Sequence, residues 1–299
     1  MRIVVALGGN ALLRPGEPAE TEVQRANLRG AARAIAAIAR EHDVVLTHGN
    51  GPQVGWLALQ SEAMHAAHPD PLDVLSAESE ALIGYLIEQE LAPLLPAREI
   101  ATLVTLVEVD ANDRAFAMPT KPIGPRYDEA SAKSLARERG WRMAPVPGGL
   151  RRVVPSPEPR RIREIGVIRR LVESGIVVVC AGGGGIPVVA TGGALRGVEA
   201  VIDKDLTAAL LAAELDADAL LLLTDVAAVY EDWPSPCERP IRRATPAELR
   251  ARSFAAGSMG PKVEAACRFA ERTGRTAAIG ALDAAVHLLD GTAGTVVRR

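Results

Sequence analysis

Arg2-Ile3-Val4-Val5-Ala6-Leu7-Gly8-Gly9-Asn10 opens the chain as an apolar, β-branched run that stops at a pair of glycines. Such a run is typical of a strand that is buried on both faces. Similar runs alternate with longer segments of helical periodicity. The predicted strands are 3–7, 44–47, 102–107, 176–180, 219–224 and 276–279, and the predicted helices are 22–40, 54–64, 80–91, 129–139, 206–215 and 262–273. This alternation predicts an α/β fold with a mainly parallel sheet and helices on both faces.

Residues 110–159 interrupt the alternation. Many of the 21 prolines fall in this stretch, and it contains one helical pattern, at 129–139. It is too long and too patterned for a simple loop. We therefore expect a single domain over residues 1–299, with residues 110–159 inserted as a subdomain that protrudes from it.

The composition excludes several classes of protein. The chain has 299 residues, a formal net charge of −3 and only three each of Phe, Trp and Tyr. These values argue against nucleic acid or an anionic membrane as the main partner. No apolar run reaches the length of a membrane span. The three cysteines, Cys180, Cys237 and Cys267, are too widely spaced for a disulfide framework or a zinc site, so we expect a reduced, cytoplasmic protein.

Lysine is rare in this chain. Of the 34 cationic residues only Lys121, Lys133, Lys204 and Lys262 are lysines, and all the others are arginines. A position that keeps lysine against this trend suits a compact ammonium rather than a planar guanidinium, although compositional bias is the simpler explanation. None of the four follows a glycine, so the chain lacks the G-x-x-x-x-G-K-[ST] phosphate loop, and it lacks the motifs of protein kinases.

Three glycine-rich segments follow predicted strands. They are Gly8-Gly9-Asn10, His48-Gly49-Asn50-Gly51-Pro52-Gln53 and Gly182-Gly183-Gly184-Gly185-Ile186-Pro187. Loops after parallel strands lie at the edge of the sheet where ligands bind, and glycine lets backbone N–H groups approach phosphate oxygens. A tight turn explains any one of these loops, but the three together favour anion binding. A dehydrogenase is a weaker alternative, because Pro187 replaces the last glycine of G-x-G-x-x-G.

Lys204 stands between Asp203 and Asp205, just before an apolar helix. One of these acids is expected to cap the helix. The functional interpretation is that the acids also hold Lys204 in place and contact Mg²⁺, directly or through water. Asp225 follows another predicted strand at the same edge of the sheet, where its structural interpretation is a turn residue.

The surroundings of the other lysines differ. Lys262 opens a helix after a Gly/Pro loop, where its charge is unfavourable unless an anion binds there. Lys121 lies in the rigid segment 119–125, which contains three prolines and is otherwise typical of an exposed connector. Lys133 fits a solvated helix face. Several ammonium groups, glycine loops and carboxylates together fit phosphoryl transfer, which depends on positioning and charge stabilisation.

These motifs resemble the carbamate kinases of the amino-acid kinase fold family, in order along almost the whole chain. The resemblance is carried by segments 5–12, 48–55, 119–125, 153–157, 182–188, 197–205 and 257–262. The most specific are T-K-P-I-G-P, G-V-E-A-V-I-D-K-D and G-S-M-G-P-K. The resemblance implies an open αβα sandwich with a protruding subdomain, and a homodimer. It implies reversible phosphoryl transfer between ATP and carbamate, giving ADP and carbamoyl phosphate with Mg²⁺.

The resemblance also implies roles for individual residues. The catalytic residues are Lys121, Lys204, Asp205 and Lys262. The residues next to carbamate and the transferred phosphoryl group are Gly8, Gly9, Asn10, Gly49, Asn50 and Gly51. Together with the loop analysis, it assigns the nucleotide to Gly183, Gly184, Asp203, Asp225, Tyr230 and Met259 and leaves the direct metal ligands open.

Two segments depart from the family pattern. Glu80-Ala81-Leu82 stands where the family commonly has a Gln-Gly pair, and Gly148-Gly149-Leu150 replaces the usual R-G-W. Neither departure touches the lysines, but both leave room for an altered substrate preference. Two alternatives therefore stay open: another small-acid or phosphate kinase of the same fold, and a nucleotide-binding relative that has lost catalysis.

Overall fold

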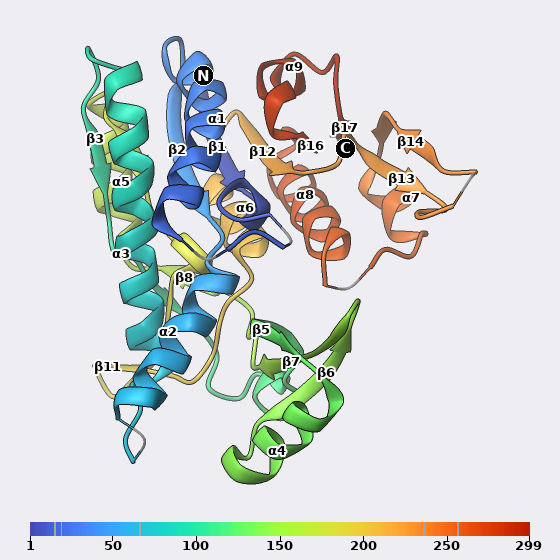
Figure 1. The fold of residues 1–299 in the computed structure, drawn as a ribbon. Coiled ribbons are helices and arrows are strands. Elements are labelled where there is room, and N and C mark those ends of the chain that lie inside the picture. Colours follow the sequence, from blue (N-terminus) through green and yellow to red (C-terminus); the bar gives the residue numbers. More distant parts are fainter. Residues whose placement is uncertain (15, 19, 66, 236, 256) are drawn as a thin grey trace.

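An eight-stranded sheet forms the centre of the computed structural model (Figure 1). The structure describes residues 1–14, 16–18, 20–65, 67–235, 237–255 and 257–299, and of Asn10 it describes only the backbone. In spatial order the strands are β15 (Arg243–Ala244), β17 (Thr295–Val297), β16 (Thr276–Ala281), β12 (Ala219–Thr224), β1 (Arg2–Leu7), β2 (Asp43–His48), β9 (Val177–Val179) and β3 (Ile100–Thr102). Neighbours are parallel except for β16 and β17, so the mainly parallel sheet is confirmed.

Helices cover both faces of this sheet. One face is covered by α1 (Thr21–Ala39), α3 (Leu72–Leu91) and α9 (Ala285–Leu289), and the other by α5 (Ile165–Glu173), α6 (Lys204–Glu214), α7 (Pro246–Arg250) and α8 (Met259–Thr273). The helices α2 (Gly51–Met64) and α4 (Glu129–Arg139) pack outside these two layers. The side chains of β1 alternate between two cores: Val4 and Ala6 pack with α6 and α8, whereas Ile3, Val5 and Leu7 pack with α1, α3 and α9. Burial on both faces confirms the open αβα sandwich. No helix in the described part of the chain is long and apolar enough to cross a membrane.

The predicted strand 102–107 is wrong, because the chain there passes from one sheet to another. β3 ends at Thr102, and β4 (Leu106–Glu108) belongs to a four-stranded sheet in the order β11 (Ala194–Gly197), β10 (Ile186–Thr191), β4 and β8 (Arg161–Ile162). Between them, the backbone N–H of Thr105 donates to the Glu80 carboxyl group at 3.1 Å instead of to a neighbouring strand. The helix predicted at 80–91 is also too short, since α3 begins directly after Pro71.

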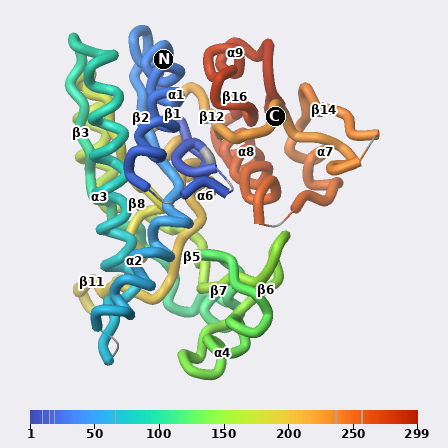
Figure 2. Tube along the Cα trace, viewed as in Figure 1, coloured from blue at the N-terminus to red at the C-terminus, as the bar shows by residue number. Residues whose placement is uncertain are grey.

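Residues 121–154 form a separate unit below the central sheet in Figure 1. It consists of a three-stranded antiparallel sheet, β5 (Lys121–Tyr127), β7 (Gly149–Val154) and β6 (Arg142–Val146), together with α4. Only α4 was expected from the sequence, because the prolines hide the strands. The Cα trace in Figure 2 shows this green unit beside α2. The contact is tight there, since a Cβ atom on Gly55 would lie 2.0 Å from the Cα of Gly124.

Candidate active site

A cleft of about 1520 Å³ lies at the carboxyl edge of the central sheet. It is lined by Gly8, Gly49 and Asp225, which directly follow β1, β2 and β12. Lys121 and Ile123 of β5 line it as well, so the cleft extends from the central sheet to the three-stranded unit. This edge is where parallel α/β proteins bind their ligands.

Most of the residues expected in the site border this cleft. They are Gly8, Gly9, Gly49, Asn50, Gly51, Lys121, Gly183, Asp203, Lys204, Asp205, Asp225, Tyr230, Met259 and Lys262. Gly184 lies behind this lining, where a Cβ atom would be 2.7 Å from the carbonyl oxygen of Ile202. The backbone of Asn10 belongs to a short 3₁₀ helix, η1 (Gly9–Ala11), but its side chain lies outside the described residues.

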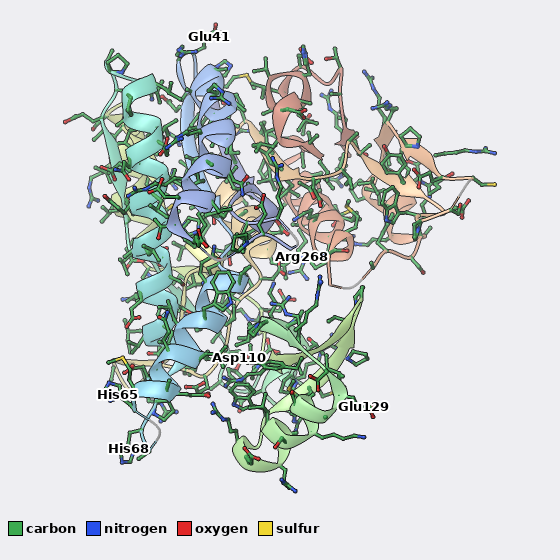
Figure 3. The ribbon with its side chains drawn as sticks, in the orientation of Figure 1. Glu41, His65, His68, Asp110, Glu129 and Arg268 are labelled. Atoms are coloured by element: carbon green, nitrogen blue, oxygen red, sulfur yellow. The ribbon has the colours of Figure 1, made fainter. Side chains whose placement is uncertain are left out.

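Lys133 lies elsewhere, as its sequence context indicates. It forms an ion pair with Glu129 at 2.7 Å, and both side chains are 76% exposed. Glu129 is labelled in Figure 3, on the outer side of the three-stranded unit. The interpretation of Lys133 as part of a solvated helix face is confirmed.

Glycine allows the loops after the central strands to approach one another closely. A Cβ atom on Gly8 would lie 2.9 Å from the carbonyl oxygen of Leu223, and one on Gly49 would lie 3.2 Å from the backbone nitrogen of Gly9. By contrast, the space beside Gly9 and Gly51 is open, with no heavy atom within 4 Å of a Cβ position. Open glycine backbone at a helix start is suited to bind phosphate oxygens.

Asp205 joins two lysines that come from different helices. Its Oδ1 accepts a hydrogen bond from Lys204 Nζ at 2.5 Å, and its Oδ2 accepts one from Lys262 Nζ at 2.9 Å. All three side chains are buried. Two ammonium groups and one carboxylate leave a net positive charge at the floor of the cleft, which favours an anionic ligand.

The pKa values of the three groups reflect this arrangement. Burial, together with repulsion from Lys262, lowers the pKa of Lys204 to about 8. Burial acts on Lys262 in the same direction, but the Asp205 carboxylate outweighs it and raises the pKa of Lys262. Burial alone would raise the pKa of Asp205, yet the two ammonium groups hold it well below its usual range. Asp205 is therefore ionised at neutral pH, and it stabilises the charged form of both lysines.

Lys121 reaches the same cleft from β5. Its Nζ donates to Asp203 Oδ2 at 2.5 Å. The other oxygen of Asp203 accepts from the backbone N–H of Asp205 at 3.0 Å, so Asp203 caps α6 as expected. The fold thus brings three of the four lysines to one cleft.

The far end of the cleft contains aromatic side chains. Tyr230 lies on β13 (Val229–Glu231), which pairs with β14 (Arg239–Ile241). Its ring centroid is 5.3 Å from that of Trp233, and both residues line the cleft with Met259. Trp233 was missed at the sequence level, although the scarcity of aromatic residues was a signal that could have found it. Flat aromatic and thioether surfaces suit an adenine ring.

A buried polar layer behind the loops was also missed. Asn50 Nδ2 donates to Ser79 Oγ at 2.9 Å, and the next residue of α3, Glu80, accepts from the backbone N–H of Gly182 at 2.8 Å. Helical spacing was the available signal, since Glu80 shares a face with the apolar Ile83 and Ile87. Because glutamate is rarely buried, this spacing did not lead to a prediction that Glu80 lies in the core.

A metal ion has no all-protein cage in the part of the chain that the structure describes. There, no three His, Cys, Asp or Glu side chains come together as ligands. The two acids closest to the lysines, Asp203 and Asp205, are already engaged in ion pairs. This donor set fits Mg²⁺ that is held mainly by phosphate oxygens, which is the usual way proteins bind it with nucleotides.

Comparison with known proteins agrees with this geometry. The model of the amino acid kinase family matches residues 1–281. A carbamate kinase of Rhizobium meliloti is 53% identical, covering 99% of this chain and 93% of the relative, and one of Haemophilus influenzae is 52% identical, covering 100% and 97%. The solved structure of a Giardia lamblia carbamate kinase bound to AMP-PNP has a TM-score of 0.90 and 41% identity, and covers 99% of this chain and 98% of that one. By fold and by near full-length similarity, the chain belongs to the amino acid kinase family and, within it, to the carbamate kinases.

Proposed function

We propose that the chain catalyses reversible, Mg²⁺-dependent phosphoryl transfer between ATP and carbamate, giving ADP and carbamoyl phosphate. The observation that carries the proposal is the Asp205 carboxylate bound to both Lys204 and Lys262 in the cleft. The relatives named carbamate kinase support the choice of carbamate as acceptor. The family likeness and the AMP-PNP-bound neighbour support a nucleotide as the other substrate.

The transfer is direct, without a phospho-enzyme. A carbamate oxygen forms a bond to the γ-phosphorus while the bond to the β,γ-bridging oxygen breaks, and the electron pair leaves with ADP. Lys204 and Lys262 stabilise the negative charge on the phosphoryl oxygens. Gly8, Gly9 and Asn10 orient the reactants from one loop, and Gly49, Asn50 and Gly51 do so from the next. Each lysine contributes on the order of a hundredfold to the rate.

The nucleotide lies along the rest of the cleft. Asp225, Tyr230 and Met259 hold its base and ribose end, and Gly183, Gly184 and Asp203 lie at its phosphate end. The aromatic pair at Tyr230 supports the base end of this orientation, and the open backbone at Gly9 and Gly51 supports phosphates in the part of the cleft near the lysines. Bound Mg²⁺ supplies positive charge to the phosphate oxygens.

Residues 110–159 act as a protruding subdomain within the single domain 1–299. Its Lys121 is the third positive charge, and closure of the subdomain brings Lys121 from Asp203 to the phosphoryl group. The reach of Lys121 into the cleft supports this role.

We further propose a cytoplasmic homodimer. In the described part of the chain the three cysteines are free, which suits a reducing compartment.

The dimer is supported by an open edge and an apolar surface. β3 is the last strand of the central sheet, and α3 exposes Val74, Leu82 and Tyr85. A second copy of the chain would pair the edge strand β3 and cover the apolar side chains of α3. Light scattering should give twice the 31.5 kDa mass of the chain, and an unchanged monomer mass in the micromolar range would contradict the dimer.

Formation of ATP from ADP and carbamoyl phosphate with Mg²⁺ tests the activity, with Lys262→Ala as the control. Parallel assays offer acetylglutamate, UMP and isopentenyl phosphate to the enzyme with ATP, and a preference for one of them would replace carbamate. Binding of ADP by calorimetry without turnover on any acceptor would instead identify an inactive relative.

A further inference from the structure

A buried carboxyl group holds the Gly182 loop from behind. Glu80 is 1% exposed. Its Oε1 accepts from the backbone N–H of Gly182 at 2.8 Å, and its Oε2 accepts from that of Thr105 at 3.1 Å. The Thr105 hydroxyl in turn accepts from the backbone N–H of Ala181 at 2.9 Å. Glu80 and its partner thus fix the chain at the point where β9 passes into the loop.

The loop that Glu80 holds is part of the cleft. It forms a short 3₁₀ helix, η4 (Gly182–Gly184), whose middle residue lines the cleft. A Cβ atom on Gly183 would lie 2.1 Å from Asn50 Nδ2, and the carbonyl of Gly184 accepts from Thr207 Oγ1 of α6 at 2.9 Å. Since α6 carries Lys204 and Asp205, a shift of Gly182 would displace both the loop that lines the cleft and the helix that carries these two residues.

Backbone N–H groups, Thr105 and Glu164 are the main influences on Glu80, and no Lys or Arg side chain in the described part of the chain forms an ion pair with it. His48 of β2 faces it across Gly182, where a Cβ atom would lie 2.3 Å from the imidazole Nε2 and 3.1 Å from Glu80 Cγ. Cys180, at the end of β9, and Glu164, before α5, complete these surroundings.

These groups favour an uncharged carboxyl group. Burial raises the pKa of Glu80 to about 8, although its two backbone hydrogen bonds favour the ionised form, and the charge of Glu164 adds to the rise. Burial also lowers the pKa of His48 to about 4, so the imidazole is neutral at pH 7. An ionised Glu80 would therefore be a buried charge without a counterion, which is unfavourable.

We propose that Glu80 is a positioning residue that holds the Gly182 loop in its protonated, neutral form. The proposal rests on the proposed function, because the loop is assigned there to the nucleotide. The neutral acid has nearly the shape of a carboxamide, whose oxygen can accept from Gly182 as Glu80 Oε1 does but whose NH₂ group cannot accept from Thr105. At a pH well above 8 the acid ionises and places a negative charge behind a loop that binds an anion.

The test compares Glu80→Gln and Glu80→Ala with Glu88→Gln. Glu88 is the matched control, since it lies on the same helix and bonds Thr102 Oγ1 at 2.9 Å, outside the loop. At pH 7 we expect Glu80→Ala, which leaves two buried N–H groups unpaired, to lose about tenfold or more in kcat/KM. Glu80→Gln keeps the acceptor for Gly182 but not the one for Thr105, so it should lose clearly less than Glu80→Ala, whereas Glu88→Gln should leave kcat/KM unchanged.

The pH dependence separates positioning by a neutral acid from a merely structural contact. Because the pKa of Glu80 is raised by folding, its contribution to stability is complete below about pH 4.5 and is lost as the pH rises towards 8. Glutamine does not titrate, so the Tm of Glu80→Gln minus that of the parent should rise by about 5 °C or more between pH 5 and pH 8. The ratio of kcat/KM for Glu80→Gln to that of the parent should also rise between pH 7 and pH 9, and Lys204, which both enzymes share, cancels in this ratio.

Two results would overturn the proposal: Glu80→Gln as impaired as Glu80→Ala at pH 7, or a Tm difference that stays constant from pH 5 to pH 8. If Glu80→Ala does not fold, the pH series of Glu80→Gln decides alone. If the parent makes no ATP, the proposed function fails, but the Tm series and calorimetric ADP binding still test Glu80.

Discussion

Replacing Asp205 by asparagine removes the charge that two lysines share while keeping the size of the side chain. The carboxylate oxygens lie 2.5 Å from Lys204 Nζ and 2.9 Å from Lys262 Nζ. At an effective dielectric constant of about 20, unit charges about 3 Å apart attract each other by about 5 kcal/mol. The amide dipole retains part of this attraction, and a loss of about 3 kcal/mol lowers a lysine pKa by about two units.

The consequence is largest for Lys204, because its pKa is already only about 8. In Asp205→Asn it falls below neutrality, so the side chain is mostly uncharged at pH 7. With a pKa about two units lower, only about a tenth of the Lys204 side chains remain charged at pH 7, so kcat/KM should fall by about tenfold. Since the lysines can release a proton instead of remaining charged and unpaired, the fold should survive, with a modest fall in Tm.

The assay is ATP formation from ADP and carbamoyl phosphate between pH 6 and pH 9. Lowering the pH reprotonates the lysines, so the activity of Asp205→Asn relative to the parent should rise as the pH falls from 8 to 6. Glu129→Gln is the control, because it breaks the exposed pair with Lys133 and should leave activity unchanged. Activity of Asp205→Asn within threefold of the parent at pH 7, or a ratio independent of pH, would refute the reasoning.

Three further variants test other parts of the site. Lys262→Arg keeps the charge but not its compact form, so ATP formation should fall at least tenfold with an unchanged fold by circular dichroism; full activity would make the scarcity of lysine a compositional bias. Lys121→Ala should lower kcat about a hundredfold with only a modest fall in Tm, because Asp203 loses its ion pair but still accepts from the backbone N–H of Asp205; a loss confined to stability would contradict its role. Gly55→Ala places a Cβ 2.0 Å from the Cα of Gly124, and such overpacking costs about 1–3 kcal/mol, so both Tm and kcat/KM should fall; a normal Tm would show that the contact is loose.

Local patterns predicted the parts of the fold that depend on neighbours in sequence. β1 and its glycine turn follow from an apolar run that stops at Gly8, and Asp203 caps α6 as its position before an apolar helix indicates. The α/β fold class follows from the alternation of short apolar runs and helical patterns along the chain. These features need no knowledge of distant residues.

The features that were wrong or missed depend on contacts between distant segments. The strand predicted at 102–107 is divided at Thr105, whose N–H bonds Glu80, 25 residues away. Asp205 and Lys262 are separated by 57 residues, and Lys121 and Asp203 by 82. Their positions in the sequence alone do not show that such residues are in contact. The resemblance to the carbamate kinases gathered them into one site, and the structure supplies the pairing.

The order of strands has a consequence for synthesis on the ribosome. β1 is made first, but it lies between β2 and β12, and β12 ends only at Thr224. Until that residue emerges, the hydrogen-bonding edge of β1 that β12 later covers is unpaired, on a strand that is apolar on both faces. Such an edge is prone to pair with other chains. β12, whose last residues line the cleft, thus also protects the nascent chain from aggregation, and chains truncated before β12 should accumulate in inclusion bodies.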